Sequence, residues 1–270
     1  SGPISDRFGR KRILQVAAIL FFVSALGSAL APNFATLVIA RMVGGIGVGA
    51  SLIIAPVFIA EIAPAARRGR LVSFNQLNIV LGISVAFFTN FLIVKLGDSD
   101  AAWVEKLGII RHNWRWMLGL ETLPALLYFF ALFLVPRSPR WLMMKGLKEE
   151  ALEILKKVNE EKAAREEYKK IEASLKGKGE KKKGTVSHLF KPALRLVVTI
   201  GVVIGILQQI TGINAVFFYA PMIFEQTGIG TNAAFSQAVL VGLTNLVFTI
   251  LAILFIDRFG RRFLLLIGLT

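Results

Sequence analysis

The sequence has no cysteine and only two histidines, His112 and His188, among its 270 residues. Without cysteine there is no disulfide bond, thiol nucleophile or thiolate metal ligand, and two separate histidines do not indicate a metal site. The glycine-rich run Gly44–Gly49 lies inside an apolar segment with no strand before it, so it predicts close helix packing and not phosphate binding. No nucleophile, base and orienting group converge. We expect no enzyme activity, no cofactor and no metal.

Long stretches of the sequence also lack charge. Hydrophobic residues make up 55% of the chain and the mean hydropathy is +0.64, whereas soluble domains are roughly 45–50% apolar. The net charge of +15 comes from basic clusters that flank apolar runs. A nucleic-acid-binding protein would carry these residues on a folded polar face, so we expect a membrane protein with no nucleic-acid partner.

Six apolar segments are long enough to cross a bilayer, which takes about 20 residues of helix. We expect helices because barrel strands span with about 10 residues and because backbone groups in lipid must be hydrogen-bonded within the segment. The predicted fold class is therefore an all-α polytopic membrane protein. A seventh span begins near Phe263, and we expect spans to be missing at both ends. The six segments are Ile13–Ala31, Leu37–Ile62, Val72–Val94, Trp114–Val135, Val197–Pro221 and Ala233–Ile256.

The loops between these segments alternate in charge. Cytoplasmic loops carry the excess of Lys and Arg, so we expect the basic loops 1–12, 63–71, 137–195 and 257–262 to be cytoplasmic. The intervening loops hold few or balanced charges and no N-glycosylation sequon, which favours a bacterial inner (plasma) membrane.

An internal repeat divides the chain. The hexapeptide Asp6–Lys11 recurs as Asp257–Arg262, each time in a cytoplasmic loop between two spans. Such a recurrence is typical of two parallel repeats. If each repeat has six spans, twelve in all, the count of spans on either side of the linker fits. We therefore predict a partial N-terminal bundle at 1–136 (spans three to six), a cytoplasmic amphipathic helical linker at 137–194, and a partial C-terminal bundle at 195–270 (spans seven, eight and the start of nine).

Several motifs resemble those of the major facilitator superfamily and, within it, the sugar porter family of bacterial xylose-, glucose- and galactose-type transporters. The resemblance implies alternating-access transport of a monosaccharide, a hexose or pentose, by proton-coupled symport. A facilitative uniporter and a transporter-like sugar sensor remain alternatives. One departure is Arg137, where the family usually has Glu. The motifs are GxxxDRxGRK at Gly2–Lys11, RxxxGxxxG at Arg41–Gly49, the run Glu61–Arg70, PRSPRWL at Pro136–Leu142, and QQxxGxNxxxFY at Gln208–Tyr219.

Amide side chains inside the spans are the candidate substrate ligands. An amide is costly in hydrocarbon unless it faces a wet cavity or another helix, and its donors and acceptors match the hydroxyls of a neutral sugar. Bonding between helices is the alternative role. The resemblance places these amides at the sugar site, with an aromatic face beside them, and Gly212 predicts a bend in the same span. The candidates are Gln76, Gln208, Gln209, Asn214 and Asn245, with Phe218 and Tyr219.

Charged residues suggest two further functions. Glu121 is a carboxylate well inside the Trp114–Val135 span and, with Arg41, is a candidate for proton coupling; snorkelling is the alternative for Arg41. The two DRxGR loops can latch helix ends together by charge-assisted hydrogen bonds, or their basic residues can merely fix the topology. The predicted cytoplasmic gate consists of Asp6, Arg7, Arg10, Glu61, Arg68, Arg140, Asp257, Arg258 and Arg261.

Overall fold

The computed structural model describes residues 2–64, 68–99, 102–179, 192–228, 230–260 and 266, and within them every regular element is a helix. Six of the described helical segments are long and apolar enough to cross a membrane, which confirms the all-α polytopic prediction. The predicted seventh span near Phe263 lies outside the described residues. The six segments are Arg10–Ala29, Phe34–Ile62, Arg68–Gly97, Asn113–Leu134, Leu194–Glu225 and Thr231–Phe255.

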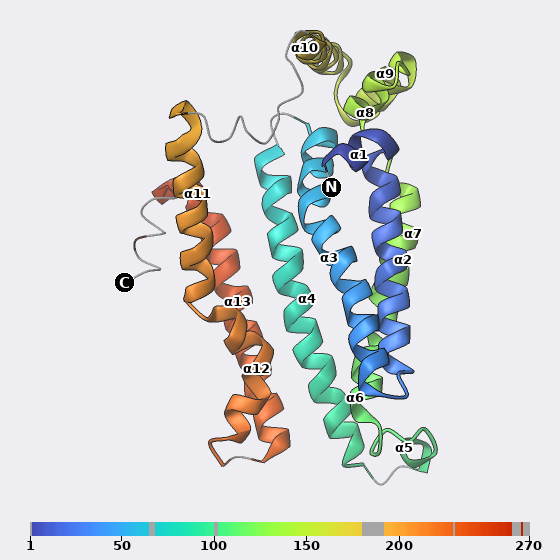
Figure 1. The fold of residues 1–270 in the computed structure, drawn as a ribbon, viewed down its shortest axis with the longest axis vertical. Helices are drawn as coiled ribbons and strands as arrows, with labels where there is room; N and C mark the ends of the chain where they lie inside the picture. Colours follow the sequence, from blue (N-terminus) through green and yellow to red (C-terminus); the bar gives the residue numbers. More distant parts are fainter. Residues whose placement is uncertain are drawn as a thin grey trace.

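The first three spans are single long helices that stand side by side (Figure 1). Asn33 caps the second of them, because its Oδ1 accepts a hydrogen bond from the backbone N–H of Thr36 at 2.9 Å. These helices carry few charges between their ends, as lipid requires. They are α2 (Arg10–Ala29), α3 (Phe34–Ile62) and α4 (Arg68–Gly97), preceded by the short α1 (Gly2–Phe8).

The fourth span is divided, although the sequence predicted one helix. Helix α6 (Asn113–Leu120) ends one residue before Glu121, and α7 (Thr122–Leu134) begins one residue after it. Pro124 explains the break, since its ring removes a backbone N–H and clashes with the carbonyl four residues earlier.

The fifth span is divided as well, and here the predicted bend is confirmed. Helix α11 (Pro192–Ile210) and α12 (Ile213–Glu225) meet at Gly212, whose φ of +71° is left-handed and suits glycine. The chain then continues into α13 (Thr231–Phe259).

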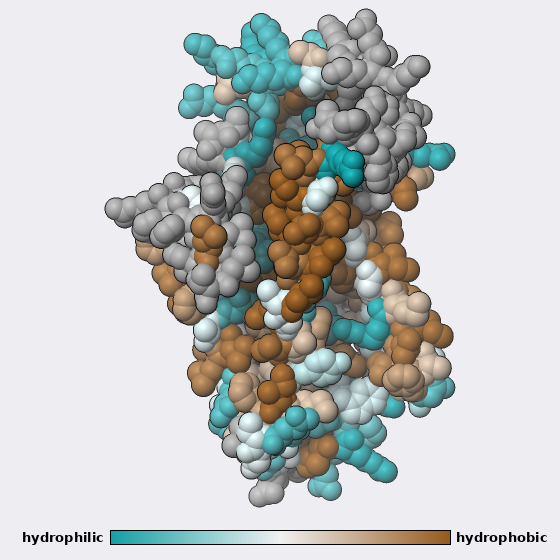
Figure 2. Space-filling view, turned by 60° about the vertical axis from the view of Figure 1, so that its left-hand side comes forward, coloured by the Kyte–Doolittle hydropathy of each residue, from teal (hydrophilic) through white to brown (hydrophobic). Residues whose placement is uncertain are grey.

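Helix α2 packs against α3, α6 and α7, within the predicted N-terminal bundle. The apolar core between them contains Leu14, Ile54, Phe58 and Leu132. On the face of the molecule shown in Figure 2, hydrophobic side chains gather over the middle and hydrophilic ones at the two ends. This is the distribution expected of a protein embedded in a bilayer.

The glycine-rich run lies against α2, as the prediction of close helix packing requires. A Cβ built on Gly44 would collide with the side chain of Ser24, and one on Gly47 would lie 3.0 Å from the ring of Phe21. A Cβ on Gly45 would meet nothing within 4 Å among the described residues.

We expect Gly44→Ala to destabilise the bundle by about 1–3 kcal/mol, because an added methyl group overpacks the α2–α3 contact. Thermal unfolding of the purified protein in detergent measures the change. Gly45→Ala is the matched control and should leave the melting temperature unchanged or raise it. Equal stability of the two variants would contradict the close packing at Gly44.

Helices α4 and α13 pack against each other. Ser84 on α4 donates a hydrogen bond from Oγ to the carbonyl of Gly242 on α13 at 2.9 Å. A Cβ on Gly242 would lie 3.0 Å from the ring of Phe87 and 3.2 Å from Cα of Ser84, so glycine suits this close approach. Asn232 and Asp98 form a second hydrogen bond between the outer ends of the same two helices.

Three helices of the linker lie beyond the cytoplasmic end of the N-terminal bundle (Figure 1). They bury a small apolar core of their own, which includes Leu142, Leu155 and Ile171. Exposed ion pairs lie on the surface of these helices. In one of them Arg165 donates a hydrogen bond to the Glu161 carboxylate, which lowers the pKa of that carboxyl below its usual range. The helices are α8 (Pro139–Met144), α9 (Lys148–Val158) and α10 (Glu161–Gly179), while α5 (Ala102–Lys106) lies at the opposite end.

Candidate functional site

The break between α11 and α12 brings two of the predicted amides together. The left-handed Gly212 turns the chain, and Asn214 then donates a hydrogen bond from Nδ2 to Oε1 of Gln209 at 3.0 Å. Thr211 supports the turn because its Oγ1 donates to the carbonyl of Gln208 at 2.7 Å. The side chains of Gln208, Gln209 and Asn214 are all exposed. They form a neutral polar group, rich in donors and acceptors, in the middle of an apolar span.

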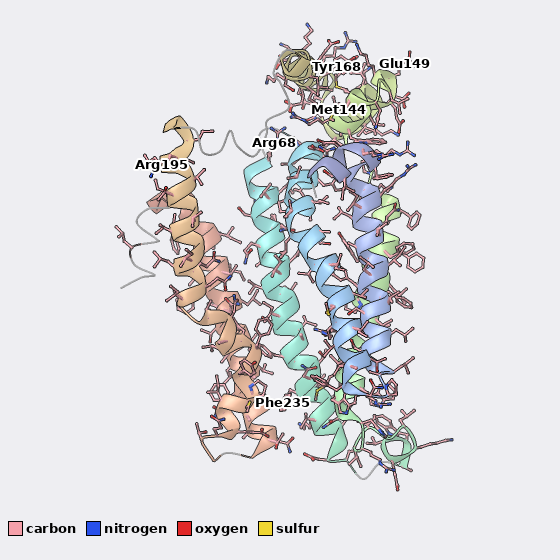
Figure 3. All side chains as sticks on the ribbon, in the orientation of Figure 1. Arg68, Met144, Glu149, Tyr168, Arg195 and Phe235 are labelled. Atoms are coloured by element: carbon pink, nitrogen blue, oxygen red, sulfur yellow. The ribbon has the colours of Figure 1, made fainter. Side chains whose placement is uncertain are left out.

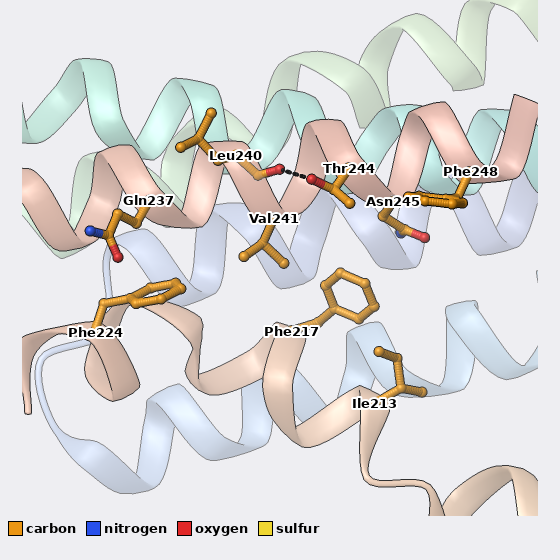
Figure 4. A pocket seen from close by; sticks show the side chains of 9 residues that line it. All are labelled: Ile213, Phe217, Phe224, Gln237, Leu240, Val241, Thr244, Asn245 and Phe248. Carbon is orange, nitrogen blue, oxygen red and sulfur yellow. Dashed lines mark hydrogen bonds between the residues drawn. The ribbon is translucent and has the colours of Figure 1, made fainter. Parts of the chain in front are cut away.

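A cavity of about 520 Å³ opens between α12 and α13, and Asn245 lies in its wall (Figure 4). Thr244 and Gln237 add polar groups, and the hydroxyl of Thr244 donates to the carbonyl of Leu240 at 2.8 Å. The rest of the wall includes Phe217 and other aromatic side chains. Apolar walls with a few placed polar groups are usual for small-molecule sites.

Gln237 and Thr244 were not among the predicted ligands. The signal that could have found them is helical spacing: Gln237 precedes Thr244 and Asn245 by about two turns, which puts all three on one face of α13.

Of the seven predicted ligands, Asn245 alone is among the described residues that line this cavity, and the amide group of Gln208, Gln209 and Asn214 lies outside that lining. Gln76 lies on α4, where its side chain is exposed, and it is not among the described residues that line the cavity. Phe218 and Tyr219 on α12 are exposed too and are not among the described residues that line the cavity. Phe217 and Phe224 of the same helix line it instead. The aromatic side chains that α12 gives to the wall are therefore not the two that the resemblance suggested. The substrate-binding roles of all seven candidates stay predictions.

The two residues singled out for proton coupling form an ion pair. Arg41 on α3 donates from a guanidinium Nη1 to Oε2 of Glu121 at 2.9 Å. Glu121 occupies the break between α6 and α7, which turns a carboxylate out of an apolar span. About half of each side chain is exposed, 50% for Arg41 and 51% for Glu121, so the pair is accessible and not sealed in the core.

A buried charge cluster ties the cytoplasmic helix ends together. Arg10 is 6% exposed and pairs with Asp6 at 2.7 Å and with Glu61 at 3.0 Å. Ser138, just before α8, donates to the Glu61 carboxylate at 2.5 Å. Arg10 also donates to the carbonyl of Ser5 at 3.1 Å. The cluster thus connects α1, α2, α3 and the residue before α8, and the gate role of Asp6, Arg10 and Glu61 stays a prediction.

Trp141 of α8 closes the cluster from the side. Its Nε1 donates to the carbonyl of Asp6 at 3.2 Å. Gly9 has a φ of +91°, and a Cβ there would lie 3.1 Å from the Trp141 ring. Both features explain why the DRxGR motif needs glycine at this position.

The other predicted gate residues are placed differently. Arg68 does not join Glu61; it pairs with Glu167 of α10 at 2.7 Å, at the end of α4 that faces the linker (Figure 3). Arg7 lies over the ring of Phe8, and Arg140 forms no ion pair within the part of the chain that the structure describes. The partner of each of these side chains depends on which helix end lies beside it in the fold, and a sequence motif does not specify that.

The second DRxGR loop cannot be compared in the same way. Asp257 and Arg258 belong to the last turn of α13, but their side chains lie outside the described part, as does the whole of Arg261. Arg137 is the departure from the family pattern. Its Nη1 lies 3.6 Å from Oε1 of Glu150, so it forms an ion pair with a residue of α9.

We expect Glu61→Gln to lower the stability of the protein by about 3 kcal/mol, because it removes one of the two carboxylates that neutralise the buried Arg10. Thermal unfolding in detergent gives the difference. Glu149→Gln is the control, since Glu149 is exposed on α9. A melting temperature for Glu61→Gln equal to that of the control would mean that the cluster adds no stability.

Comparison with known proteins identifies the family. The profile described as "Sugar (and other) transporter" matches residues 1–270. The chain is 43% identical over 268 residues to an arabinose-proton symporter of Bacillus subtilis (strain 168), covering 99% of this chain and 56% of that protein. It is 41% identical over 291 residues to a D-xylose-proton symporter of Escherichia coli (strain K12), with the same coverages of 99% and 56%. The chain thus spans about half the length of these relatives.

Solved structures agree in fold. The partially occluded inward-open xylose transporter XylE from E. coli superimposes with a TM-score of 0.79 at 38% identity, covering 96% of this chain and 58% of that one. The proton:xylose symporter XylE bound to 6-bromo-6-deoxy-D-glucose gives 0.76 at 39% identity, covering 96% and 56%.

Proposed function

We propose that this chain, which belongs to the sugar transporter family, acts within a carrier that moves a monosaccharide across the bacterial inner membrane together with a proton. The carrier would work by alternating access, with two helical bundles rocking about a site near the bilayer midplane.

The observation that carries this proposal is the amide pair at the break of the fifth span. Gln209 and Asn214 bond to each other across Gly212, so each amide can exchange this bond for one to a sugar hydroxyl. A neutral site suits a neutral polyol and its reversible release, whereas a charged cavity would suit an ion. Relatives at 43% and 41% identity carry arabinose and xylose, both pentoses, in their names, and a solved structure at 39% identity is bound to 6-bromo-6-deoxy-D-glucose, a hexose derivative, which together support a pentose or a hexose as substrate.

We expect Gln209→Ala to weaken sugar transport at least about tenfold, because a buried hydroxyl of the sugar would lose its partner at a cost of roughly 1–3 kcal/mol. The assay is counterflow of radiolabelled pentoses and hexoses into proteoliposomes that contain the protein at its native full length. Gln226→Ala, which changes an exposed amide beyond the end of α12, should transport normally.

The outcomes distinguish the alternatives. Unchanged counterflow in Gln209→Ala would remove the amide site from the proposal. Sugar binding without any counterflow in the unaltered protein would identify a sensor instead of a carrier.

Coupling to protons would rest on Glu121. A carboxylate in a membrane span holds its charge only with a partner, and Arg41 supplies one at 2.9 Å. Protonation of Glu121 would release Arg41, so the ion pair gives a proton a way to change the contact between α3 and the α6–α7 break. A facilitative uniporter would have the same sugar site without this response.

We expect Glu121→Gln to retain counterflow but to lose accumulation driven by an imposed proton gradient, because the amide mimics the protonated acid permanently. Glu105→Gln, an exposed carboxylate on α5, is the control and should accumulate sugar normally. Full gradient-driven accumulation by Glu121→Gln would exclude this carboxylate as the coupling group and favour uniport or coupling elsewhere.

A further inference from the structure

A second pocket lies at the cytoplasmic end of the N-terminal bundle, away from the amide site. It has a volume of about 210 Å³ and is bounded by the start of α2, the end of α7 and the first turn of α8. Four cationic residues line it, and none of its described lining residues is acidic. The cations are Arg10, Lys11, Arg12 and Arg137.

Two of these cations are already engaged. Arg10 is neutralised by Asp6 and Glu61 in the buried cluster. Lys11 donates to the carbonyls of Val135 at 2.7 Å and Phe133 at 3.2 Å, so it caps the end of α7, but carbonyls do not cancel its charge.

The other two are open to a ligand. Arg12 is exposed and forms no ion pair with any described residue. Arg137 has only Glu150, at 3.6 Å and with both side chains more than two-fifths exposed, a pair of the weak surface type. The four cations of the pocket outnumber the three carboxylates that pair with them, Asp6, Glu61 and Glu150, so the pocket keeps an excess of positive charge.

The wall of the pocket continues into an apolar surface. Phe133 lines the pocket and is 57% exposed, and Leu134 beside it is 88% exposed. On the neighbouring α2, Val16 is 54% exposed about one turn below Arg12. A bound molecule would thus contact cations at one end and exposed apolar side chains of α2 and α7 along the rest of its length.

We propose that this pocket binds the phosphate of an anionic phospholipid of the cytoplasmic leaflet, with Arg12 and Arg137 as its ligands and the acyl chains along α2 and α7. Basic pockets between membrane helices on the cytoplasmic side suit anionic head groups. The volume is smaller than the roughly 300–1,000 Å³ usual for a whole soluble ligand, so the pocket fits a head group whose remainder lies outside it. This site is independent of the proposed sugar substrate.

The test is native mass spectrometry of the full-length protein in detergent, titrated with phosphatidylglycerol and, separately, with phosphatidylcholine. We expect a preference for phosphatidylglycerol that the double variant Arg12→Gln/Arg137→Gln weakens by about fivefold for each cation removed. Lys157→Gln, which removes one exposed cation of α9 outside the pocket, is the control for the single variant Arg12→Gln. It should bind phosphatidylglycerol as the unaltered protein does.

Thermal unfolding with sodium phosphate or glycerol phosphate separates a lipid site from an ion site. We expect phosphatidylglycerol to raise the melting temperature and the two soluble phosphates to leave it unchanged. Equal stabilisation by the soluble phosphates, equal binding of the two lipids, or unaltered lipid binding by the double variant would each overturn the proposal. Arg12→Gln alone, at an exposed position, provides the same comparison if the double variant does not fold.

Discussion

In hydrocarbon, every backbone N–H and C=O must find its partner within the protein, and the structure follows from that requirement. It makes the spans helical and makes any interruption costly, so a helix breaks only where a residue forces it. Two breaks occur in the described spans, one at Gly212 and one at Glu121 ahead of Pro124. Each break exposes polar groups in the middle of an apolar segment. The breaks therefore account for the exposure of the amide pair and of the membrane carboxylate.

The cytoplasmic end follows a different rule, because water and head groups there tolerate charge. Even so, Arg10 is buried, and a buried guanidinium is stable only when its charge and hydrogen bonds are met. Asp6 and Glu61 balance its charge, the carbonyl of Ser5 accepts a hydrogen bond from one of its Nη atoms, and Ser138 donates to the Glu61 carboxylate. The arrangement fixes how the first linker helix sits on the bundle, which in turn shapes the basic pocket beside it.

Hydropathy and loop charge were enough to predict the spans, because membrane insertion is a property of segment composition. The bend at Gly212 was predictable for the same local reason, since glycine favours left-handed backbone. The break at Glu121 was missed because Pro124 does not always end a membrane helix. Pairings such as Arg68 with Glu167 depend on how the linker docks, and no local pattern encodes that docking. Gln237 was missed because a polar residue near a span end is ambiguous until its helical face is known.

One helix connects the two charged sites mechanically. Arg41, the partner of Glu121, and Glu61, the partner of Arg10, both belong to α3. At 1.5 Å per residue their Cα atoms are separated by about 30 Å along the helix axis, nearly the thickness of the hydrocarbon core. A helix of this length moves largely as a rigid rod, although Pro56 gives it a site for a bend. Any change in the contact between Arg41 and Glu121 that tilts α3 must therefore also displace Glu61. The membrane carboxylate and the cytoplasmic latch would then respond together without a chain of small side-chain movements between them.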